Sequence, residues 1–336
     1  MRLTIRDVAK KLNLSITTVS RALDGYADVA NDTRKLVIET AREMGYTPNR
    51  AARQLRRQKA ETIGFILPAH ARRFDEPFFA EFIAGLGNEL SGKNFDLLVS
   101  NAADDEMEHR LYQRWVSSRK VDGFILNRVS QKDWRVQFLA REGIPFAALG
   151  MSQDGLNYPH IRIDGLEGFV ELVRHLQQGG FSRFAFIGGR ENLINHIDRL
   201  GWFKAALAVC GLPFDQGLVF SSDMTSTGGY EVARRLFALP RGPDALLCIS
   251  DETAFGALHA AHERGLTVGR DIAIAGFEGV QDSRHTEPPL TTLDIPVEKI
   301  ARQLVTMLLA KLNGETLERD EIVIHPTLLI RASTGG

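Results

Sequence analysis

The residue types and spacing that most suggest a specific chemistry lie near the start of the chain. If residues 16–23 form a helix, its outward face carries the side chains of Ile16, Thr17, Ser20 and Arg21. An arginine can bond guanine or phosphate with two parallel hydrogen bonds, and an isoleucine can contact the methyl group of thymine. The pattern therefore predicts a helix that reads bases in the major groove of DNA.

Two helices and a tight turn are needed to hold such a face. Thr4 can cap a first helix and Ser15 can cap the second, which should end at Asp24 and Gly25. A third amphipathic segment covers about 32–44, with inward positions expected at Leu36, Val37, Ala41 and Met44. The structural alternative is a generic three-helix bundle whose polar face is only solvated.

A short basic segment follows at 46–58. It carries four arginines around the apolar Leu55, and Pro48 suits the first turn of a helix. Two helical turns are too short to be stable alone in water. We therefore expect a hinge helix that forms on DNA, with Leu55 wedged between base pairs of the minor groove. The alternative is a solvated basic tether.

These stretches closely resemble the lactose/galactose repressor family of bacterial transcription regulators. The most specific motifs are Thr-Val-Ser-Arg-Ala-Leu at 18–23, Gly-Tyr-x-Pro-Asn at 45–49 and Pro-Pro-Leu-Thr-Thr at 288–292. The resemblance covers the chain nearly end to end. It implies a homodimeric repressor on palindromic operator DNA, controlled by a small-molecule effector that is commonly a sugar. Ala30 departs from the family's usual capping serine, so we expect Asn31 or Asp32 to cap the third helix.

The charge distribution agrees with a DNA-binding head. Residues 1–60 carry a net charge of +7, and residues 61–336 carry −8. A basic head on an acidic body is the asymmetry expected of a protein whose small domain meets DNA. The residues expected to contact DNA are Thr4, Ser15, Ile16, Thr17, Thr18, Ser20, Arg21, Thr33, Tyr46, Asn49, Arg50, Ala52, Leu55 and Arg56.

From Glu61 onward, short apolar strands alternate with amphipathic helices. This pattern predicts α/β lobes, each with a parallel sheet covered by helices on both faces. The expected fold is thus an all-α helix-turn-helix head followed by a two-lobed α/β body. The resemblance implies a body like a periplasmic binding protein, in which the chain crosses between lobes three times.

The expected domains follow from these boundaries. The head spans 1–47, the hinge helix and linker span 48–60, and the effector-binding and dimerisation domain spans 61–336. Its two lobes are expected to comprise about 61–160 with 293–322, and about 161–292 with 323–331.

Such lobes bind ligands at the carboxyl ends of their strands. Among the strand-end residues, matching the family's motifs favours Asn127, Arg199, Ser250 and Glu278 for hydrogen bonds, and Phe79 and Met224 for packing. Trp202 stands where the family usually has a glycine three residues after the arginine. The expected effector-binding residues are Phe79, Asn127, Asp164, Arg199, Met224, Ser250, Asp251 and Glu278.

Several of these residues have a purely structural alternative. Asp164 and Asp251 can each cap a helix, Phe79 can be a core residue, and Arg199 can be a surface charge. Because some of the matched pocket positions depart from the family's usual residues, the ligand is expected to be an α-glucoside or another oligosaccharide.

The sequence gives little support for an enzyme, a metal-binding protein or a membrane protein. The chain lacks a phosphate-binding loop and a Gly-x-Ser-x-Gly elbow, so we expect no enzyme and no cofactor. Cys210 and Cys248 are expected to be free buried thiols, and no metal-ligand spacing exists. No apolar run reaches membrane length and no secretory signal precedes Thr4, so we expect a cytoplasmic protein. No heptad tail follows Ile330, which favours a dimer over a tetramer.

Two alternatives remain open at this point. A sugar-binding transport receptor would share the two-lobed body, but it would carry an export signal in place of the head. A DNA-binding regulator could instead be controlled by a protein corepressor bound to the surface of the body.

Overall fold

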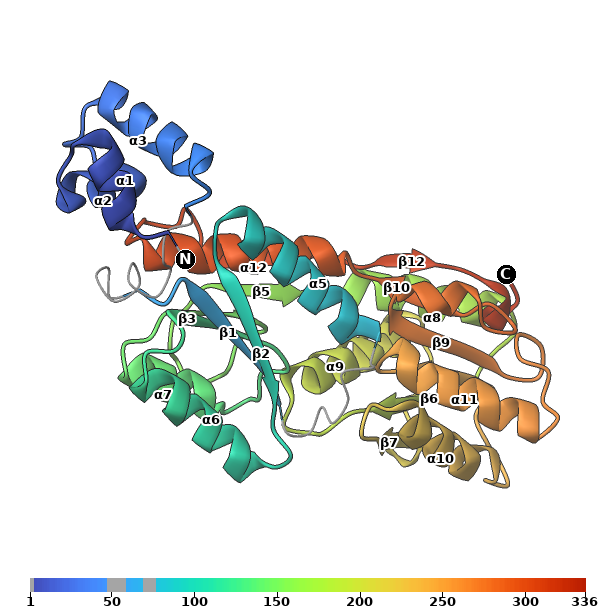
Figure 1. The fold of residues 1–336 in the computed structure, drawn as a ribbon. Helices are drawn as coiled ribbons and strands as arrows, with labels where there is room; N and C mark the ends of the chain where they lie inside the picture. Colours follow the sequence, from blue (N-terminus) through green and yellow to red (C-terminus); the bar gives the residue numbers. More distant parts are fainter. Residues whose placement is uncertain (1–2, 47–58, 69–76) are drawn as a thin grey trace. The chain divides into compact units, whose positions relative to one another are not determined.

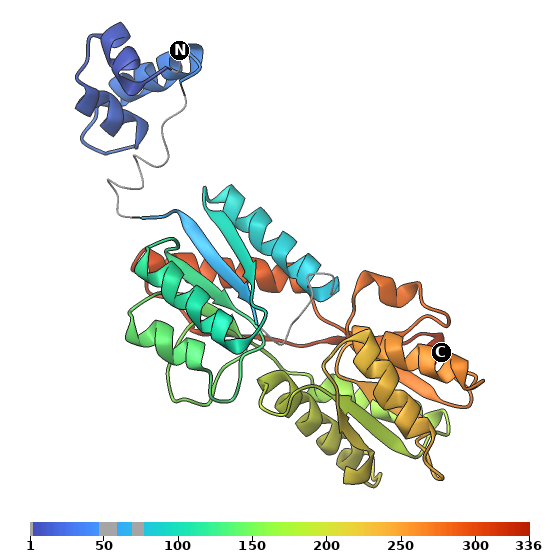
Figure 2. The ribbon, with the colours of Figure 1, turned by 60° about the horizontal axis from the view of Figure 1, so that its bottom comes forward.

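The computed structural model describes residues 3–46, 59–68 and 77–336. The chain divides into two units, Met1–Ala60 and Glu61–Gly336, which Figures 1 and 2 show as a small helical head and a larger α/β body.

The head contains three described helices, α1 (Ile5–Leu12), α2 (Ile16–Leu23) and α3 (Asn31–Glu43). Val8, Val19 and Val37 are fully buried, one from each helix, and form the centre of its core. Asn13 turns the chain between α1 and α2 in a left-handed conformation. The expected cap of α2 is confirmed, because the Ser15 hydroxyl accepts the N–H of Thr18 at 3.0 Å.

Two expectations for α3 were wrong. Its N-cap is Ala30, whose side chain makes no capping bond, and neither Asn31 nor Asp32 replaces it. Leu36 was expected to face inward but is 51% exposed, because the buried face of α3 consists of Val37, Thr40 and Ala41.

The first lobe of the body contains a six-stranded parallel sheet in the order β11-β5-β4-β3-β1-β2. Its strands are β1 (Thr62–Leu67), β2 (Asp96–Asn101), β3 (Gly123–Leu126), β4 (Phe146–Leu149), β5 (His160–Ile163) and β11 (Glu321–Ile324). One face packs on α5 (Pro77–Gly92) and α12 (Val297–Leu312), and the other on α6 (Asp105–Ser117) and α7 (Trp134–Arg141).

The second lobe repeats this plan with the order β12-β10-β9-β8-β6-β7, in which only β12 runs antiparallel. Its strands are β6 (Phe184–Gly188), β7 (Val219–Ser221), β8 (Ala245–Cys248), β9 (Ala273–Glu278), β10 (Thr291–Asp294) and β12 (Thr327–Leu329). The covering helices are α8 (Leu166–Gln178) with α9 (Ile194–Val209) on one face, and α10 (Ser226–Phe237) with α11 (Asp251–Glu263) on the other.

The chain passes between the lobes after β5, after β10 and after β11. The expected lobe limits therefore shift by a few residues. The limit at 292/293 falls inside β10, all four residues of which belong to the second sheet, and the limit at 160/161 falls inside β5 of the first. Strands β5, β10, β11 and β12 were not identified from the sequence. The architecture itself, a helical head and two α/β lobes, is confirmed.

Candidate functional site

The DNA-reading face expected on the head is presented by α2. Ile16 is 45% exposed, Thr17 and Arg21 are exposed and Ser20 is half-buried. The opposite side of the helix supplies Val19 to the core. The second helix of the turn motif thus carries polar and apolar groups outward, as a recognition helix requires.

The guanidinium of Arg21 is already held within the head. Its Nε donates to Asp28 at 3.3 Å, its Nη2 forms an ion pair with the same carboxylate, and Tyr26 lies beneath it at 5.1 Å from the ring centre. Asp28 and Arg21 are both exposed, so this pair can open at little cost when a base or phosphate competes.

The remaining expected DNA contacts are placed as follows. Thr4 is exposed, Thr33 and Tyr46 are half-buried, and Ser15 and Thr18 bond each other at 2.8 Å. The other expected contacts lie outside the described residues: Asn49, Arg50, Ala52, Leu55 and Arg56.

In the body, a cavity of about 170 Å³ lies where strands of both sheets end. The first lobe contributes residues that follow β3 and β4, and the second lobe contributes one face of α9 and the end of β9. This is the position that the topology of open parallel sheets favours for ligands. The lining residues are Phe78, Asn127, Arg128, Val129, Leu149, Gly150, Met151, Gln153, Ile161, Arg162, Ile163, Ile194, Asn195, Asp198, Arg199, Trp202, Glu278 and Ile295.

Three of the eight expected effector-binding residues come together here: Asn127, Arg199 and Glu278. Arg199 is buried, so it is not the surface charge of the structural alternative. Its Nη1 donates to the carbonyl of Ile249 and lies 3.8 Å from Glu278, and its guanidinium stacks on Phe277. Burial lowers the pKa of Arg199, and the charge of Glu278 opposes that shift.

The other five do not line this cavity, and each has a structural partner. Phe79 is fully buried in the core beneath Arg128, and Met224 is buried against Gly189. Ser250 caps α11 through the N–H of Thr253 at 3.2 Å. Asp164 pairs with Arg162 at 3.4 Å and borders a different surface depression.

The carboxylate of Asp251 is held by hydrogen bonds on both oxygens. One carboxylate oxygen accepts the N–H of Val280 at 2.9 Å, and the other accepts the hydroxyl of Thr292 at 2.6 Å. The side chain is fully buried, and burial raises its pKa to about 7. It therefore ties α11 to the strands β9 and β10 beside the cavity.

Two lining residues adopt backbone conformations that cost energy. Arg128 has φ +49° and Glu278 has φ +111°, a region that non-glycine residues rarely occupy. Such strain costs on the order of 1–3 kcal/mol per residue and gathers at functional sites. Arg128 lies two residues beyond the end of β3, and Glu278 is the last residue of β9, so both lie where a strand ends at the cavity.

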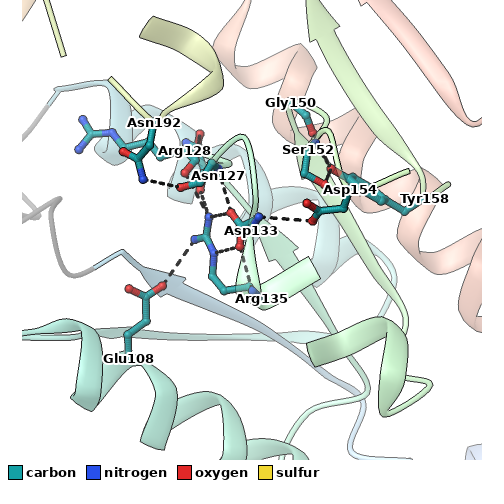
Figure 3. A network of polar contacts seen from close by, with 11 residues as sticks. Glu108, Asn127, Arg128, Asp133, Arg135, Gly150, Ser152, Asp154, Tyr158 and Asn192 are labelled. Carbon is teal, nitrogen blue, oxygen red and sulfur yellow. Dashed lines mark hydrogen bonds and ion pairs between the residues drawn. The ribbon is translucent and has the colours of Figure 1, made fainter. Parts of the chain in front are cut away.

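A buried ionic network supports the loop that carries Asn127 (Figure 3). Arg135 Nη2 bonds the carbonyls of Asn127 and Arg128 at 3.2 and 3.1 Å and the carboxylate of Asp133 at 2.6 Å. Its Nη1 lies 3.6 Å from Glu108. Burial alone would lower the pKa of the Arg135 guanidinium, but Asp133, Tyr112 and Glu108 together outweigh burial and raise that pKa.

The same loop bonds directly to the second lobe. The N–H of Gln131 donates to the carbonyl of Asn192 at 2.8 Å, and the N–H of Ile194 donates to the carbonyl of Val129 at 2.9 Å. Ser130 and Leu193 form an antiparallel bridge between these two bonds. The cavity is thus bordered by a backbone clasp that joins the lobes.

Sequence reasoning missed a set of lining residues on α9. Asn195, Asp198 and Trp202 share the lining with Arg199, at spacings of three, one and three residues along the helix. That spacing places them on one helical face, so fixing the face from Arg199 would have identified the others.

Comparison with known proteins places the chain in a family. Residues 4–49 match the model for bacterial regulatory proteins of the lacI family, and residues 173–334 match the periplasmic binding protein-like domain. The HTH-type transcriptional regulator AglR of Rhizobium meliloti (strain 1021) is 34% identical, with 100% of this chain and 95% of that protein covered. The regulator CelR of Thermobifida fusca is 29% identical over 99% of this chain and 98% of that protein.

Solved structures agree with this assignment. A CelR–cellobiose complex superposes with a TM-score of 0.76 at 27% identity, covering 99% of this chain and 100% of the other. The lac repressor dimer bound to operator and the anti-inducer ONPF gives 0.83 at 24% identity, with 99% of each chain covered.

The chain is therefore a DNA-binding transcriptional regulator with an effector-binding domain. It belongs to the lacI family of bacterial regulatory proteins. This assignment removes the transport-receptor alternative, and the relatives named here are regulators rather than enzymes. Within the described residues, no helix has the length and apolar character needed to cross a membrane.

The buried Asp251 predicts a pH dependence of stability. Its pKa in the folded protein lies above its unfolded value, so the folded state holds the proton more tightly, and stability should fall as pH rises from about 4 to about 7. Asp251→Asn mimics the protonated acid and should remove this part of the dependence. Urea unfolding at pH 5 and pH 8 measures this dependence. Between these two pH values, the free energy of unfolding of the wild type should fall by about 2 kcal/mol more than that of the variant. Equal losses in the two proteins would show that Asp251 does not titrate in this range.

Proposed function

We propose that this chain is a repressor whose affinity for a palindromic operator is set by a neutral sugar bound in the cavity between the two lobes. The observation that carries the proposal is the meeting of Asn127, Arg199 and Glu278 in a cavity with apolar walls. Hydrogen-bonding side chains over apolar surface suit the hydroxyls and the C–H face of a sugar. The relative CelR has been solved with cellobiose, which supports the same class of ligand.

Control of DNA binding through this cavity follows from its two-sided construction. Asn127 belongs to the first lobe, whereas Arg199 and Glu278 belong to the second. A ligand that contacts both lobes stabilises the arrangement in which all its contacts are made. It shifts the balance between arrangements only by its difference in affinity for them.

Binding as a homodimer follows from the single helix-turn-helix unit of each chain. One recognition helix reads one half-site, and two symmetry-related heads read a palindrome. Ile16, Thr17, Ser20 and Arg21 are the residues we assign to the base edges. The hinge contacts proposed for Leu55 and Arg56 lie outside the described residues.

The role of Arg21 can be tested with two variants. Arg21→Ala should weaken operator binding by about 1–3 kcal/mol, because it removes a fork that can bond guanine twice. Arg21→Lys keeps the charge but not the fork, so it should retain non-specific binding while losing operator preference. Fluorescence anisotropy with operator and scrambled duplexes at fixed salt measures both affinities. If Arg21→Lys retains full operator preference, Arg21 contacts only the backbone.

The role of the cavity can be tested by the ligand response of operator binding. Arg199→Ala should abolish the change in operator affinity that the tightest-binding sugar of a panel produces, while leaving ligand-free binding near normal. Asn127→Ala should act in the same direction and leaves the Arg199–Glu278 pair intact. Arg190→Ala is the matched control, because Arg190 is exposed and does not line the cavity.

Thermal melting of each variant shows whether the body remains folded. A full response in folded Arg199→Ala and Asn127→Ala would place the control elsewhere. A protein corepressor bound to the body surface would then be the better explanation.

A further inference from the structure

Helix α9 presents a continuous ligand-facing stripe in which Trp202 is the largest member. Asn195, Asp198, Arg199 and Trp202 all line the cavity and lie on one face of the helix. The stripe therefore combines an amide, a carboxylate, a guanidinium and an indole at one wall.

The indole of Trp202 is fixed by close packing behind the cavity. It stacks on Phe277 with ring centres 6.4 Å apart and planes at 20°, and it contacts Phe169 at 5.9 Å. Gly165 makes room for it, because a Cβ atom at that position would lie 2.8 Å from two carbons of the ring. A half-buried indole held in this way offers a rigid apolar plate to a ligand.

Two polar atoms at the cavity have no hydrogen-bond partner among the described residues. Asn127 Oδ1 accepts the N–H of Arg128 at 2.6 Å, which orients the amide and leaves its Nδ2 as an unmatched buried donor. Asn195 Oδ1 is an unmatched buried acceptor. Such atoms are costly unless a bound group satisfies them. Hydroxyl groups can do both, because each one donates and accepts.

The charges at the cavity favour a neutral ligand over an anionic one. Arg162 pairs with Glu321 at 3.0 Å and with Asp164 at 3.4 Å, and Arg199 is matched by Glu278. Asp198 adds a carboxyl group whose pKa is raised by burial. A phosphate would meet this carboxyl group, and two of the three arginines of the lining, Arg162 and Arg199, already have carboxylate partners.

The volume of the cavity is sufficient for one sugar ring. A cavity of 170 Å³ holds about a dozen water-sized spheres. A single hexose ring with its hydroxyls has a comparable number of non-hydrogen atoms. The cavity therefore has room for one sugar ring.

We propose that Trp202 and Asp198 determine specificity for one neutral hexose ring, with the indole against its C–H face and Asp198, Asn195 and Asn127 on its hydroxyls. This assignment rests on the proposed sugar-controlled function and names the ligand class and the residues that select it.

The test measures ligand binding by the full-length protein. Isothermal titration uses a panel of neutral mono- and disaccharides together with glucose 6-phosphate. We expect a neutral saccharide to bind and glucose 6-phosphate to bind more weakly than glucose. For the tightest binder, Trp202→Leu should raise Kd about tenfold or more and Trp202→Phe much less, because Phe keeps an aromatic plate. Asp198→Asn should also weaken binding, since it removes one acceptor.

A spectroscopic readout separates contact with the ligand from a merely structural role. Binding should change the tryptophan emission of the wild type and of Trp134→Phe, but not that of Trp202→Phe. Trp134 is the matched control, because it stacks on His109 away from the cavity lining. If Trp202→Leu does not fold, the emission of Trp202→Phe still decides the question.

The outcomes distinguish this assignment from the proposed function. If a neutral sugar binds through Trp202 but leaves operator affinity unchanged, the assignment stands and the proposed control fails. If a sugar changes operator affinity in Trp202→Leu as in the wild type, the control stands and the assignment fails. Preference for glucose 6-phosphate, or no binding by any neutral saccharide of the panel, also overturns the assignment.

Discussion

The buried guanidinium of Arg135 is the interaction on which the geometry of the ligand cavity depends. It lies between Asp133 and Glu108 and bonds the carbonyls of Asn127 and Arg128, so one side chain fixes the strained turn that follows β3. Removing one partner from such a buried cluster typically costs about 3–5 kcal/mol, because the remaining charges are left without compensation. The amide of Asn127 and the clasp to the second lobe both extend from this turn. A packing feature of the first lobe therefore also determines how the two lobes meet.

The cavity lies between two lobes that each have a sheet of their own. Each lobe is a sheet packed on both faces, and the residues that reach the cavity come from strand ends and from one stripe of α9. A ligand between such halves does not need to deform either core to favour one arrangement. It needs only to satisfy groups that stay unmatched without it, such as Asn127 Nδ2 and Asn195 Oδ1. This accounts for placing the ligand site between the lobes rather than within one of them.

Much of this architecture could be predicted from the sequence, because alternating strands and helices and a capped helix-turn-helix leave strong local patterns. The four missed strands are three or four residues long, and β11 and β12 pair along one edge only, so their pairing depends on contacts that no local pattern reveals. Leu36 was expected to be buried because it is apolar, but the buried face of α3 includes the polar Thr40 instead. Arg199 was identified from the sequence as a residue of the cavity, whereas Asp198 and Asn195 were not. Polar residues are common on helices, and only the structure shows which face of α9 lines the cavity. Trp202 was noticed as a departure from the family pattern, but its position at the cavity needed the structure.

The central claim is that the cavity and the operator-binding face are energetically linked. The most direct measurement is the Kd of the tightest-binding neutral saccharide, determined by isothermal titration with and without saturating operator duplex. Reciprocity requires operator to change that Kd by the same factor by which saturating saccharide changes operator affinity. We predict such a change, and it should disappear when a scrambled duplex replaces the operator. An identical saccharide Kd in the free and operator-bound protein would contradict the account.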